Sequence, residues 1–220
     1  MLRSISYWGF AFLICAMFGV QSASAQFNRG PGAPEFFGGI GYDNISLGSN
    51  SPISDEGALR FSTGMSAGPI PSLPQLRFGA DVGWAMIFDN STRTVISHNG
   101  GLIIAGSSEV PLWLLEPELT LSFRQWFGKK SPSFFVEPGI AGGGAFGFFQ
   151  LRSVTNPDVT YSENSTTGYG KAYVRAGMVS RTGVFGLEGS YLRGGQLDFG
   201  QNINGELQEW YVGIYGAIKF

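Results

Sequence analysis

The segment "LWLLEPELTLSFRQWF", residues 112–127, decides the fold of this chain. Bulky apolar residues occupy alternate positions in it: Trp113, Leu115, Pro117, Leu119, Leu121 and Phe123. The positions between them carry mostly polar or charged residues: Glu116, Glu118, Thr120, Ser122 and Arg124. Because successive side chains of a β-strand point to opposite sides, this alternation predicts a strand with one polar and one apolar face.

The same alternation recurs along the chain. We expect strands at 35–47, 58–68, 75–88, 112–127, 133–149, 168–181, 184–194 and 208–220. Glycine recurs every few residues, with 34 in all, and no helical period follows the first 25 residues. Glycine disfavours helices, so we expect none beyond that point.

Long and short connections alternate between these strands. The short ones, such as Thr182-Gly183, carry the residues of tight turns. The long ones are polar, and we expect loops at 48–57, 89–111, 150–167 and 195–207. Short turns at one end and long loops at the other are the plan of a transmembrane barrel. We therefore predict an all-β fold, an eight-stranded antiparallel up-and-down barrel with both chain ends on the short-turn side.

The small residues indicate which face lies inside. In 133–149, glycines and alanines share a face with Glu137, opposite Phe134 and Ile140. Small residues are needed where side chains converge, and an eight-stranded barrel is only just wide enough for its inner side chains. We therefore expect the charged face inside and the apolar face outside, against lipid. The alternative is a soluble barrel with an apolar interior. If the small residues lie inside, however, such a barrel would expose its bulky apolar face to water, which a soluble protein does not tolerate.

The composition fits a chain whose surroundings are not water. Charged residues make up 14% and aromatic residues 15% of the sequence. An ordinary globular domain has roughly 25% charged residues. The net charge of −2 shows no basic excess, so we expect no nucleic-acid partner.

The first residues have the pattern of a secretory signal peptide. Arg3 precedes an apolar run over 7–20, and Ala23-Ser24-Ala25 forms a cleavage site, so we expect 1–25 to be removed. The single cysteine, Cys15, falls inside this segment, and the exported chain is therefore not held by disulfides. Residues 26–34 are predicted to be a flexible lead-in, and 35–220 the barrel.

Extending the faces along every strand predicts a set of charges inside the barrel. The inward acids are Asp43, Asp81, Glu116, Glu118, Glu137, Glu188 and Glu209, and the inward bases are Arg60, Arg77, Arg124, Lys171, Arg175 and Lys219. An unpaired buried charge is costly, so we expect these near-balanced charges to pair. The hypothesis is a salt-bridged, largely filled lumen that maintains the barrel's shape, and the alternative is a selective path for solutes.

Other motifs predict little chemistry. Residues 142–147 match G-x-G-x-x-G, but they lie within a strand rather than before a helix. With one histidine, His98, and no cysteine after Cys15, we expect no metal site and no cofactor. Ser97 and His98, with Asp89 nearby, are similar to the pair that some eight-stranded outer-membrane enzymes use on lipid acyl chains. A lone loop histidine is usually a plain polar residue, so we expect no enzyme.

The C-terminal segment "WYVGIYGAIKF", residues 210–220, ends in apolar residues at alternate positions: Trp210, Val212, Ile214, Ile218 and Phe220. With the strands and loop order, it makes 35–220 resemble the small outer-membrane β-barrel proteins of Gram-negative bacteria, typified by the eight-stranded transmembrane part of outer membrane protein A. The resemblance implies that this end is an assembly signal read by the barrel-assembly machinery. The family's polar-x-Gly spacing is matched loosely, by Gly213 and Gly216.

These observations predict a monomeric outer-membrane protein, with both termini in the periplasm and outer-membrane lipid and lipopolysaccharide around it. The namesake's peptidoglycan-binding domain has no counterpart before Phe220, so no wall-anchoring role is expected. The expected role is structural, or a surface interaction through the four long loops. A narrow channel for small solutes is the first alternative, and a lipid-modifying enzyme is the second.

Overall fold

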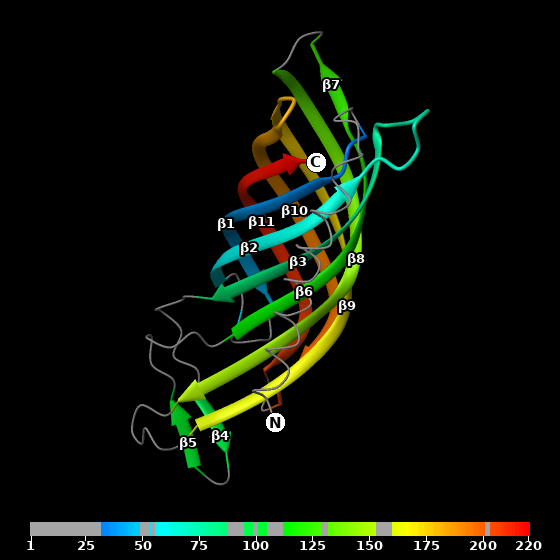
Figure 1. The fold of residues 1–220 in the computed structure, drawn as a ribbon. Helices are drawn as coiled ribbons and strands as arrows, with labels where there is room; N and C mark the ends of the chain where they lie inside the picture. The colour runs from blue at the N-terminus through cyan, green and yellow to red at the C-terminus, as the bar shows by residue number, and fades with distance from the viewer. Residues whose placement is uncertain are drawn as a thin grey trace.

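The computed structural model describes residues 32–48, 53, 56–87, 95–98, 101–104, 112–128, 132–152, 160–200 and 203–220. Over these ranges the chain forms a closed antiparallel β-barrel of eight strands (Figure 1), which confirms the predicted fold class. The expected signal peptide and most of the lead-in lie outside the described residues. No helix within the described ranges has the length and hydrophobicity needed to span a bilayer.

The barrel strands are β1 (Glu35–Ser46), β2 (Glu56–Ala67), β3 (Leu76–Ile87), β6 (Leu112–Phe123), β8 (Ser133–Arg152), β9 (Thr160–Val179), β10 (Gly183–Asp198) and β11 (Asn204–Lys219). A short strand, β7 (Gln125–Phe127), continues β6 after a break at Arg124. Between β3 and β6, β4 (Val95–His98) and β5 (Gly101–Ile104) form a separate hairpin, which Figure 1 shows near the tips of β8 and β9.

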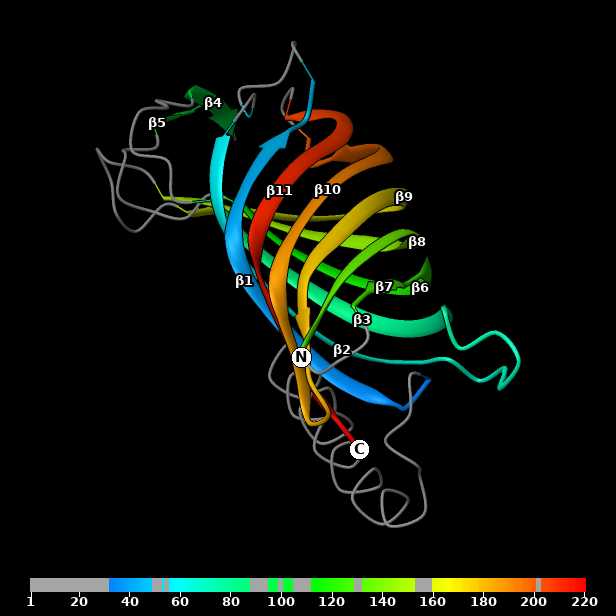
Figure 2. The ribbon, with the colours of Figure 1, turned by 90° about the horizontal axis from the view of Figure 1, so that it is seen from above.

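The ladder between the first and last strands closes the barrel. β1 pairs with β11 without a break from Glu35–Lys219 to Ser46–Gln208. Beyond it, the Phe220 N–H donates to the Pro34 carbonyl at 3.1 Å. Figure 2 shows β1, β11, β10, β9 and β8 following one another around the wall, in the order of their pairing. Every barrel strand therefore has two neighbours.

The two ends of the barrel differ in their connections. We call the end with the β1–β2, β3–β6, β8–β9 and β10–β11 connections the loop end. The other end, with the connections at 68–75, 128–132 and 180–182, is the turn end. β1 begins and β11 finishes at the turn end.

Four strands reach further at the loop end than the alternation predicted. β8 and β9 occupy much of the expected loop 150–167, and β10 and β11 occupy much of 195–207. Backbone ladders need no apolar side chains, so the polar segment 160–167 still pairs with β8 residue by residue. These predicted loop boundaries were wrong for that reason.

Two prolines interrupt the pairing of β6 and β7 with β8. The ladder breaks between Leu115 and Glu118, at Pro117. It breaks again where Pro138 of β8 lies opposite the junction of β6 and β7. Proline has no N–H to donate, which explains why this barrel strand is split into two parts.

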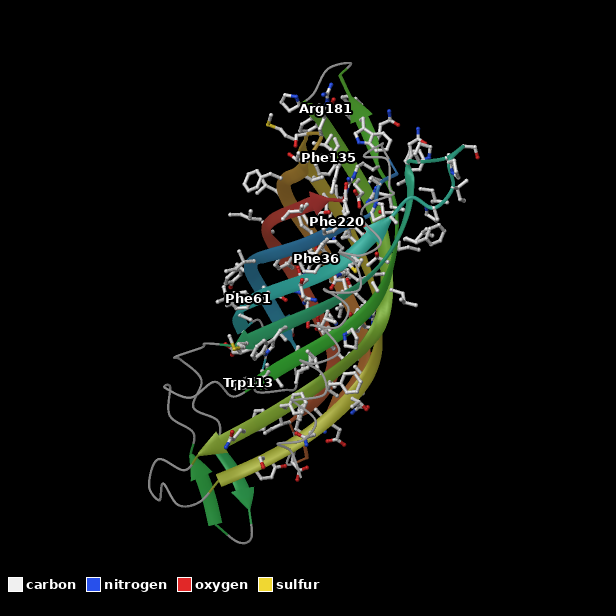
Figure 3. All side chains as sticks on the ribbon, in the orientation of Figure 1. Phe36, Phe61, Trp113, Phe135, Arg181 and Phe220 are labelled. Atoms are coloured by element: carbon white, nitrogen blue, oxygen red, sulfur yellow. The ribbon has the colours of Figure 1, made fainter. Side chains whose placement is uncertain are left out.

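The outer wall of the barrel is apolar, as the face assignment predicts. Leu119 is 73% exposed, and Phe185 and Val212 are each 64% exposed. Phe61 and Trp113 also project from the wall (Figure 3). A belt of this extent is stable against lipid rather than water, so the barrel is of the transmembrane kind.

Glycines make room for large side chains inside the barrel. A Cβ at Gly139 would lie 2.4 Å from Cζ of Tyr173, and one at Gly147 would lie 2.5 Å from Cζ of Phe199. Protein interiors are close-packed, so a larger residue at either position would displace the ring. The small residues thus lie where the inner side chains converge.

The closing ladder can be tested at Gly41. A Cβ there would lie 2.3 Å from the Val212 carbonyl oxygen and 2.4 Å from Cα of Gly213. We expect Gly41→Val to prevent closure, so that most of the protein loses the heat-modifiable gel migration of a folded barrel. Gly38→Val is the matched control in the same strand, because its Cβ would lie 3.6 Å from the nearest atom, the Ser62 oxygen. Equal folding of the two variants would contradict the prediction.

Candidate functional site: the barrel interior

Three layers of side chains fill the described part of the lumen. An apolar layer lies at the loop end, ion-paired charges extend from there to the turn end, and a smaller aromatic and apolar cluster packs among the charges at the turn end. The ion-paired charges, which we call the charge network, are Glu35, Asp43, Arg60, Arg77, Glu116, Glu118, Arg124, Glu137, Lys171, Arg175, Glu188 and Glu209. Every one of the eight barrel strands contributes to it.

Arg60 of β2 is the centre of the half of the network nearer the loop end. Its Nη1 lies 3.0 Å from Asp43 Oδ2 and 2.6 Å from Glu209 Oε2. Its Nη2 pairs with Glu116. These carboxylates come from β1, β11 and β6, so one guanidinium connects four strands. Charge-assisted hydrogen bonds of this kind are stronger than neutral ones.

A chain of ion pairs crosses the lumen nearer the turn end. Glu35 Oε2 lies 3.1 Å from Arg77 Nη2, and Glu35 Oε1 lies 2.7 Å from Arg124 Nη1. Arg124 also pairs through Nε with Glu137, which accepts a further hydrogen bond from the Ser122 hydroxyl at 2.8 Å. The chain joins β1 to β3 and β8.

Arg175 of β9 continues this chain to β10. Its Nε lies 2.6 Å from Glu188 Oε2, and its Nη1 lies 3.6 Å from Glu137 Oε1. Its guanidinium carbon lies 4.4–4.7 Å from the ring centres of Phe37, Tyr173 and Tyr215. Aromatic faces attract cations at such distances, so the rings help to stabilise a charge that is 1% exposed.

The remaining predicted charges are placed in different ways. Lys171 pairs with Glu118, whose other oxygen accepts a hydrogen bond from the Tyr169 hydroxyl at 2.8 Å. Asp81 is buried, but its Oδ1 has no hydrogen-bond partner within the described ranges. Lys219 lies at the turn end, where its Nζ donates to the Ser180 carbonyl at 3.1 Å.

The sequence interpretation missed Glu35, which is fully buried and joins Arg77 to Arg124. Its spacing of eight residues from Asp43 puts both on the inner face of β1, and that signal could have found it. With Glu35 inside and Lys219 at the rim, eight acids and five bases are buried among the described residues. The interior is therefore more acidic than the near-balanced set that we expected.

The layer at the loop end, which we call the apolar cap, was not predicted. Its members are Ile45, Leu47, Ile53, Ala58, Ala85, Ile87, Leu112, Leu114, Ala145, Phe149, Tyr161, Tyr169, Leu192, Leu197, Phe199, Ile203 and Leu207. Four of them come from connections rather than strands: Leu47, Ile53, Phe199 and Ile203. The N–H of Leu47 donates to the Ile53 carbonyl at 2.9 Å, and that of Phe199 donates to the Ile203 carbonyl at the same distance. The described residues of these two connections thus fold inward at the mouth of the barrel.

Tyr161 fastens one of these connections. Its hydroxyl donates to the Phe199 carbonyl, and its ring lies 6.4 Å from that of Phe149. Burial, together with the nearby carboxylates of Glu163 and Asp198, raises the pKa of Tyr161. The hydroxyl therefore keeps its proton and remains a donor at neutral pH.

The cluster at the turn end packs among the charges of that end. It comprises Phe37, Phe135, Val179, Val184, Tyr215 and Ala217, with Trp126 packed against it. The rings of Phe37 and Tyr215 lie 5.7 Å apart. The guanidinium carbon of Arg124 lies 4.9 Å from the Phe135 ring centre, so charge and aromatic layers interlock here.

The described residues show little that is suited to catalysis or metal binding. Within them, no group of three or more His, Cys, Asp or Glu side chains is placed to hold a metal ion. Asp89 of the hypothetical lipid-modifying set lies outside the described residues. Ser97 and His98 belong to β4, and only their backbone is described. That set stays a prediction.

The alternating residues of the last strand face outward. Trp210, Val212, Ile214 and Ile218 are between 49% and 64% exposed on the outer wall. Phe220 follows the strand at the turn end and is half-buried. This arrangement fits a lipid-facing terminal strand, and its role as an assembly signal stays a prediction.

Comparison with known proteins identifies the fold. No protein-family model matches the sequence, and no curated protein matches it either. Neisserial surface protein A is similar in structure, with a TM-score of 0.51, 14% identity, and coverage of 85% of this chain and 97% of that one. The N-terminal β-barrel domain of Pseudomonas aeruginosa OprF (TM-score 0.44, 10% identity, 86% and 98% coverage) and Ail of Yersinia pestis (0.44, 12%, 86% and 99%) are more distant. At these identities the likeness concerns the fold alone.

Arg60 provides a test of the charge network. Replacing it by Met would leave the carboxylates of Asp43, Glu116 and Glu209 without their cation. We expect Arg60→Met to lower the free energy of unfolding in urea by about 3–5 kcal/mol, the usual cost of breaking a buried pair. Arg193→Met is the matched control, because the side chains of the Arg193–Glu206 pair are 64% and 57% exposed and such pairs contribute little. Similar losses in both variants would argue against a buried network.

Charge exchange tests the Lys171–Glu118 pair. Glu118→Lys places two like charges together in the lumen, and we expect it to lower the temperature at which the folded gel band converts to the unfolded one. Adding Lys171→Glu should restore part of that temperature, since the pair is then re-formed in the opposite sense. If the double variant is no more stable than Glu118→Lys alone, the pair does not contribute as described.

Proposed function

We propose, from a fold shared with the small eight-stranded outer-membrane barrels, that this chain is a non-conducting outer-membrane protein with a structural or surface-interaction role. In this proposal the loop end faces outward from the cell and both termini lie in the periplasm. The barrel acts as a rigid, lipid-embedded support for the extracellular loops. Outer-membrane lipid and lipopolysaccharide surround it, and the barrel-assembly machinery reads its last strand.

The filling of the interior is the observation that carries this proposal. An eight-stranded barrel is just wide enough for its own side chains. The apolar cap fills the loop end, the charge network and the turn-end cluster fill the rest of the described lumen, and Arg77, Arg124 and Arg175 are at most 1% exposed. A conducting pore needs a continuous wet path lined by groups that exchange with the ion's hydration shell. The three layers argue against such a path.

The shape of the loop end supports a role at the surface. β8 and β9 are 20 residues long, longer than the 12 residues of β1, β2 and β3. A transmembrane β-strand needs only about 9–11 residues. The paired ends of β8 and β9, with the β4–β5 hairpin nearby, therefore project beyond the lipid. On the outer face they present polar residues such as Asn164 and Thr166, which are both exposed.

The described residues support the two alternative functions less well than the structural or surface-interaction role. A channel for small solutes would have to displace both the cap and the ion pairs. A lipid-modifying enzyme would depend on Asp89, Ser97 and His98, whose side chains carry no described geometry. We therefore expect a monomeric barrel whose activity, if any, is binding at the loops.

Conductance separates the filled lumen from a channel. We expect the purified protein in planar lipid bilayers to show no steady single-channel current at neutral pH. The double variant Phe199→Ser, Ile203→Ser loosens the apolar cap, and it should remain silent because the charge network still fills the lumen below. Steady nanosiemens steps from the unmodified protein would overturn the filled-lumen proposal.

Loop replacement tests the surface role. Cells expressing the protein should lose binding to surfaces or to neighbouring cells when residues 89–111 are replaced by a short Gly-Ser turn. The matched control replaces the turn-end residues 69–73 in the same way, and it should bind like the unmodified protein. Both variants are first checked for heat-modifiable migration. If replacing each long loop in turn leaves binding unchanged, the surface-interaction role is wrong.

A further inference from the structure

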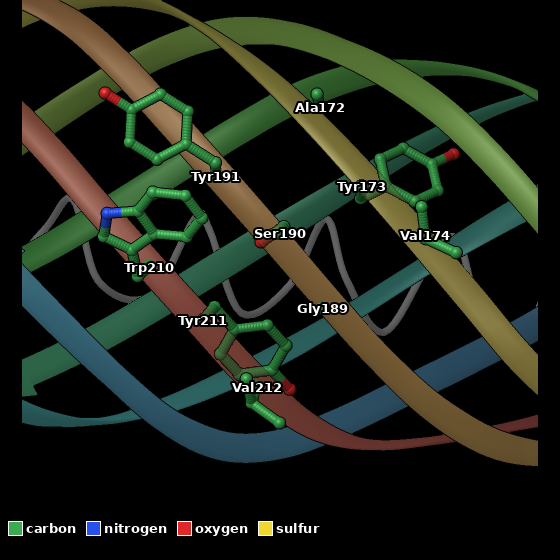
Figure 4. A pocket seen from close by; sticks show the side chains of 9 residues that line it. All are labelled: Ala172, Tyr173, Val174, Gly189, Ser190, Tyr191, Trp210, Tyr211 and Val212. Atoms are coloured by element: carbon green, nitrogen blue, oxygen red, sulfur yellow. The ribbon is translucent and has the colours of Figure 1, made fainter.

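The outer wall carries a recess where three neighbouring strands meet. Its volume is about 340 Å³, and the outward-facing residues that line it come from β9, β10 and β11: Ala172, Val174, Gly189, Tyr191, Trp210 and Val212 (Figure 4). We call it the wall recess. It lies outside the lumen and does not belong to the three layers described above.

The absence of a side chain at Gly189 creates the wall recess. Gly189 lies directly opposite Val174 of β9 and Val212 of β11, which rise on either side of it. Towards the loop end, Tyr191 and Trp210 are direct partners, and their ring centres lie 4.4 Å apart. The aromatic pair therefore closes the recess on that side. Towards the turn end, the next outward residue of β10 is Leu187, which is 61% exposed in the apolar belt.

The position of the wall recess indicates what fills it. It is continuous with the belt that faces hydrocarbon, so its surroundings are acyl chains rather than water or a folded partner. An acyl chain lying along β10 from Tyr191 past Gly189 to Leu187 would cover the recess between the side chains of the two valines that flank Gly189. The indole N–H of Trp210 and the hydroxyl of Tyr191 lie at the end where an acyl chain joins its polar head group.

Arg193 supplies a charge at the head-group level. It is the next outward residue after Tyr191 on β10, and its side chain is 64% exposed. One of its nitrogens, Nη2, donates to Glu206 at 2.8 Å. A guanidinium has five N–H donors, so others remain for a phosphate oxygen. A phosphorylated lipid is therefore favoured over a neutral one.

We propose that the wall recess is a binding site for one acyl chain of lipopolysaccharide, the phosphorylated glycolipid of the outer leaflet, with a phosphate held by Arg193. This inference rests on the proposed function, because the loop end must face the outer leaflet. The site lies on the wall and would fix one lipid at the β9–β11 side, which distinguishes it from the non-specific lipid around the rest of the belt.

Native mass spectrometry of the detergent-folded protein tests the site, with purified lipid A and dephosphorylated lipid A offered as competing probes. We expect retention of lipid A over its dephosphorylated form by about tenfold, which corresponds to ~1.4 kcal/mol. Gly189→Leu fills the recess without a backbone clash, because the nearest atom to its Cβ is the Tyr211 oxygen at 3.9 Å. It should abolish the preference.

Two further variants make the test specific. Gly142→Leu is the matched control, another outward glycine whose Cβ has room, 3.6 Å from the Tyr169 oxygen, but on β8 away from the recess. It should retain lipid A like the unmodified protein. Arg193→Met should reduce retention of lipid A several-fold and leave retention of dephosphorylated lipid A unchanged.

The outcomes separate this inference from the proposed function. Equal retention of lipid A by the unmodified protein, Gly189→Leu and Gly142→Leu would overturn the wall recess as a site. Equal retention of lipid A and dephosphorylated lipid A would overturn the phosphate contact of Arg193, and with it the assignment to a phosphorylated glycolipid. In either case, a heat-modifiable barrel recovered from outer-membrane fractions would leave the proposed function intact. Recovery as a soluble protein would instead contradict the proposed function.

Discussion

The unbroken ladder between β1 and β11 is the constraint on which the rest of this structure depends. In hydrocarbon, no water is present to satisfy a free backbone N–H or C=O, so an open strand edge costs several kcal/mol for each group. Closure removes both edges at once. It also determines which face is inside, because a slip of one residue would turn every side chain of a strand to the other face. Gly41 and Gly213, directly opposite each other, allow the two strands to approach closely enough.

Closure of the barrel places the charged side chains inside the lumen, where they pair mainly with one another. This pairing is long-range: Arg60 and Glu209 are separated by 149 positions in the chain and meet across the lumen. Breaking such pairs is costly because the remaining charge stays buried. The rings around Arg175 add to the pairing without bringing further charge. The network therefore stabilises the arrangement of strands, and it occupies the volume that a pore would need.

Because side chains fill the described interior, the loop end and the outer wall are the two surfaces that are left for binding. At the loop end the paired strands β8 and β9 are the longest of the barrel, and the wall carries a recess over Gly189. Both features depend on the same barrel, which holds the strand ends and the wall residues in position. In the proposed function, recognition would be carried by the loops and by shape at the lipid boundary rather than by a central site.

The sequence by itself determined the fold class, the inner and outer faces and most of the inner charges, because a period of two and the position of small residues are local signals. Its strand ends were less accurate at the loop end, since polar residues such as those at 160–167 pair through the backbone regardless of their side chains. Only the tertiary structure decided which charges meet, for example Arg60 with Glu116 and Glu209, because register around a closed barrel brings together residues far apart in the chain. It also decided the apolar cap, which forms when Phe199 and its neighbours fold inward, and the wall recess, which exists only where three strands align.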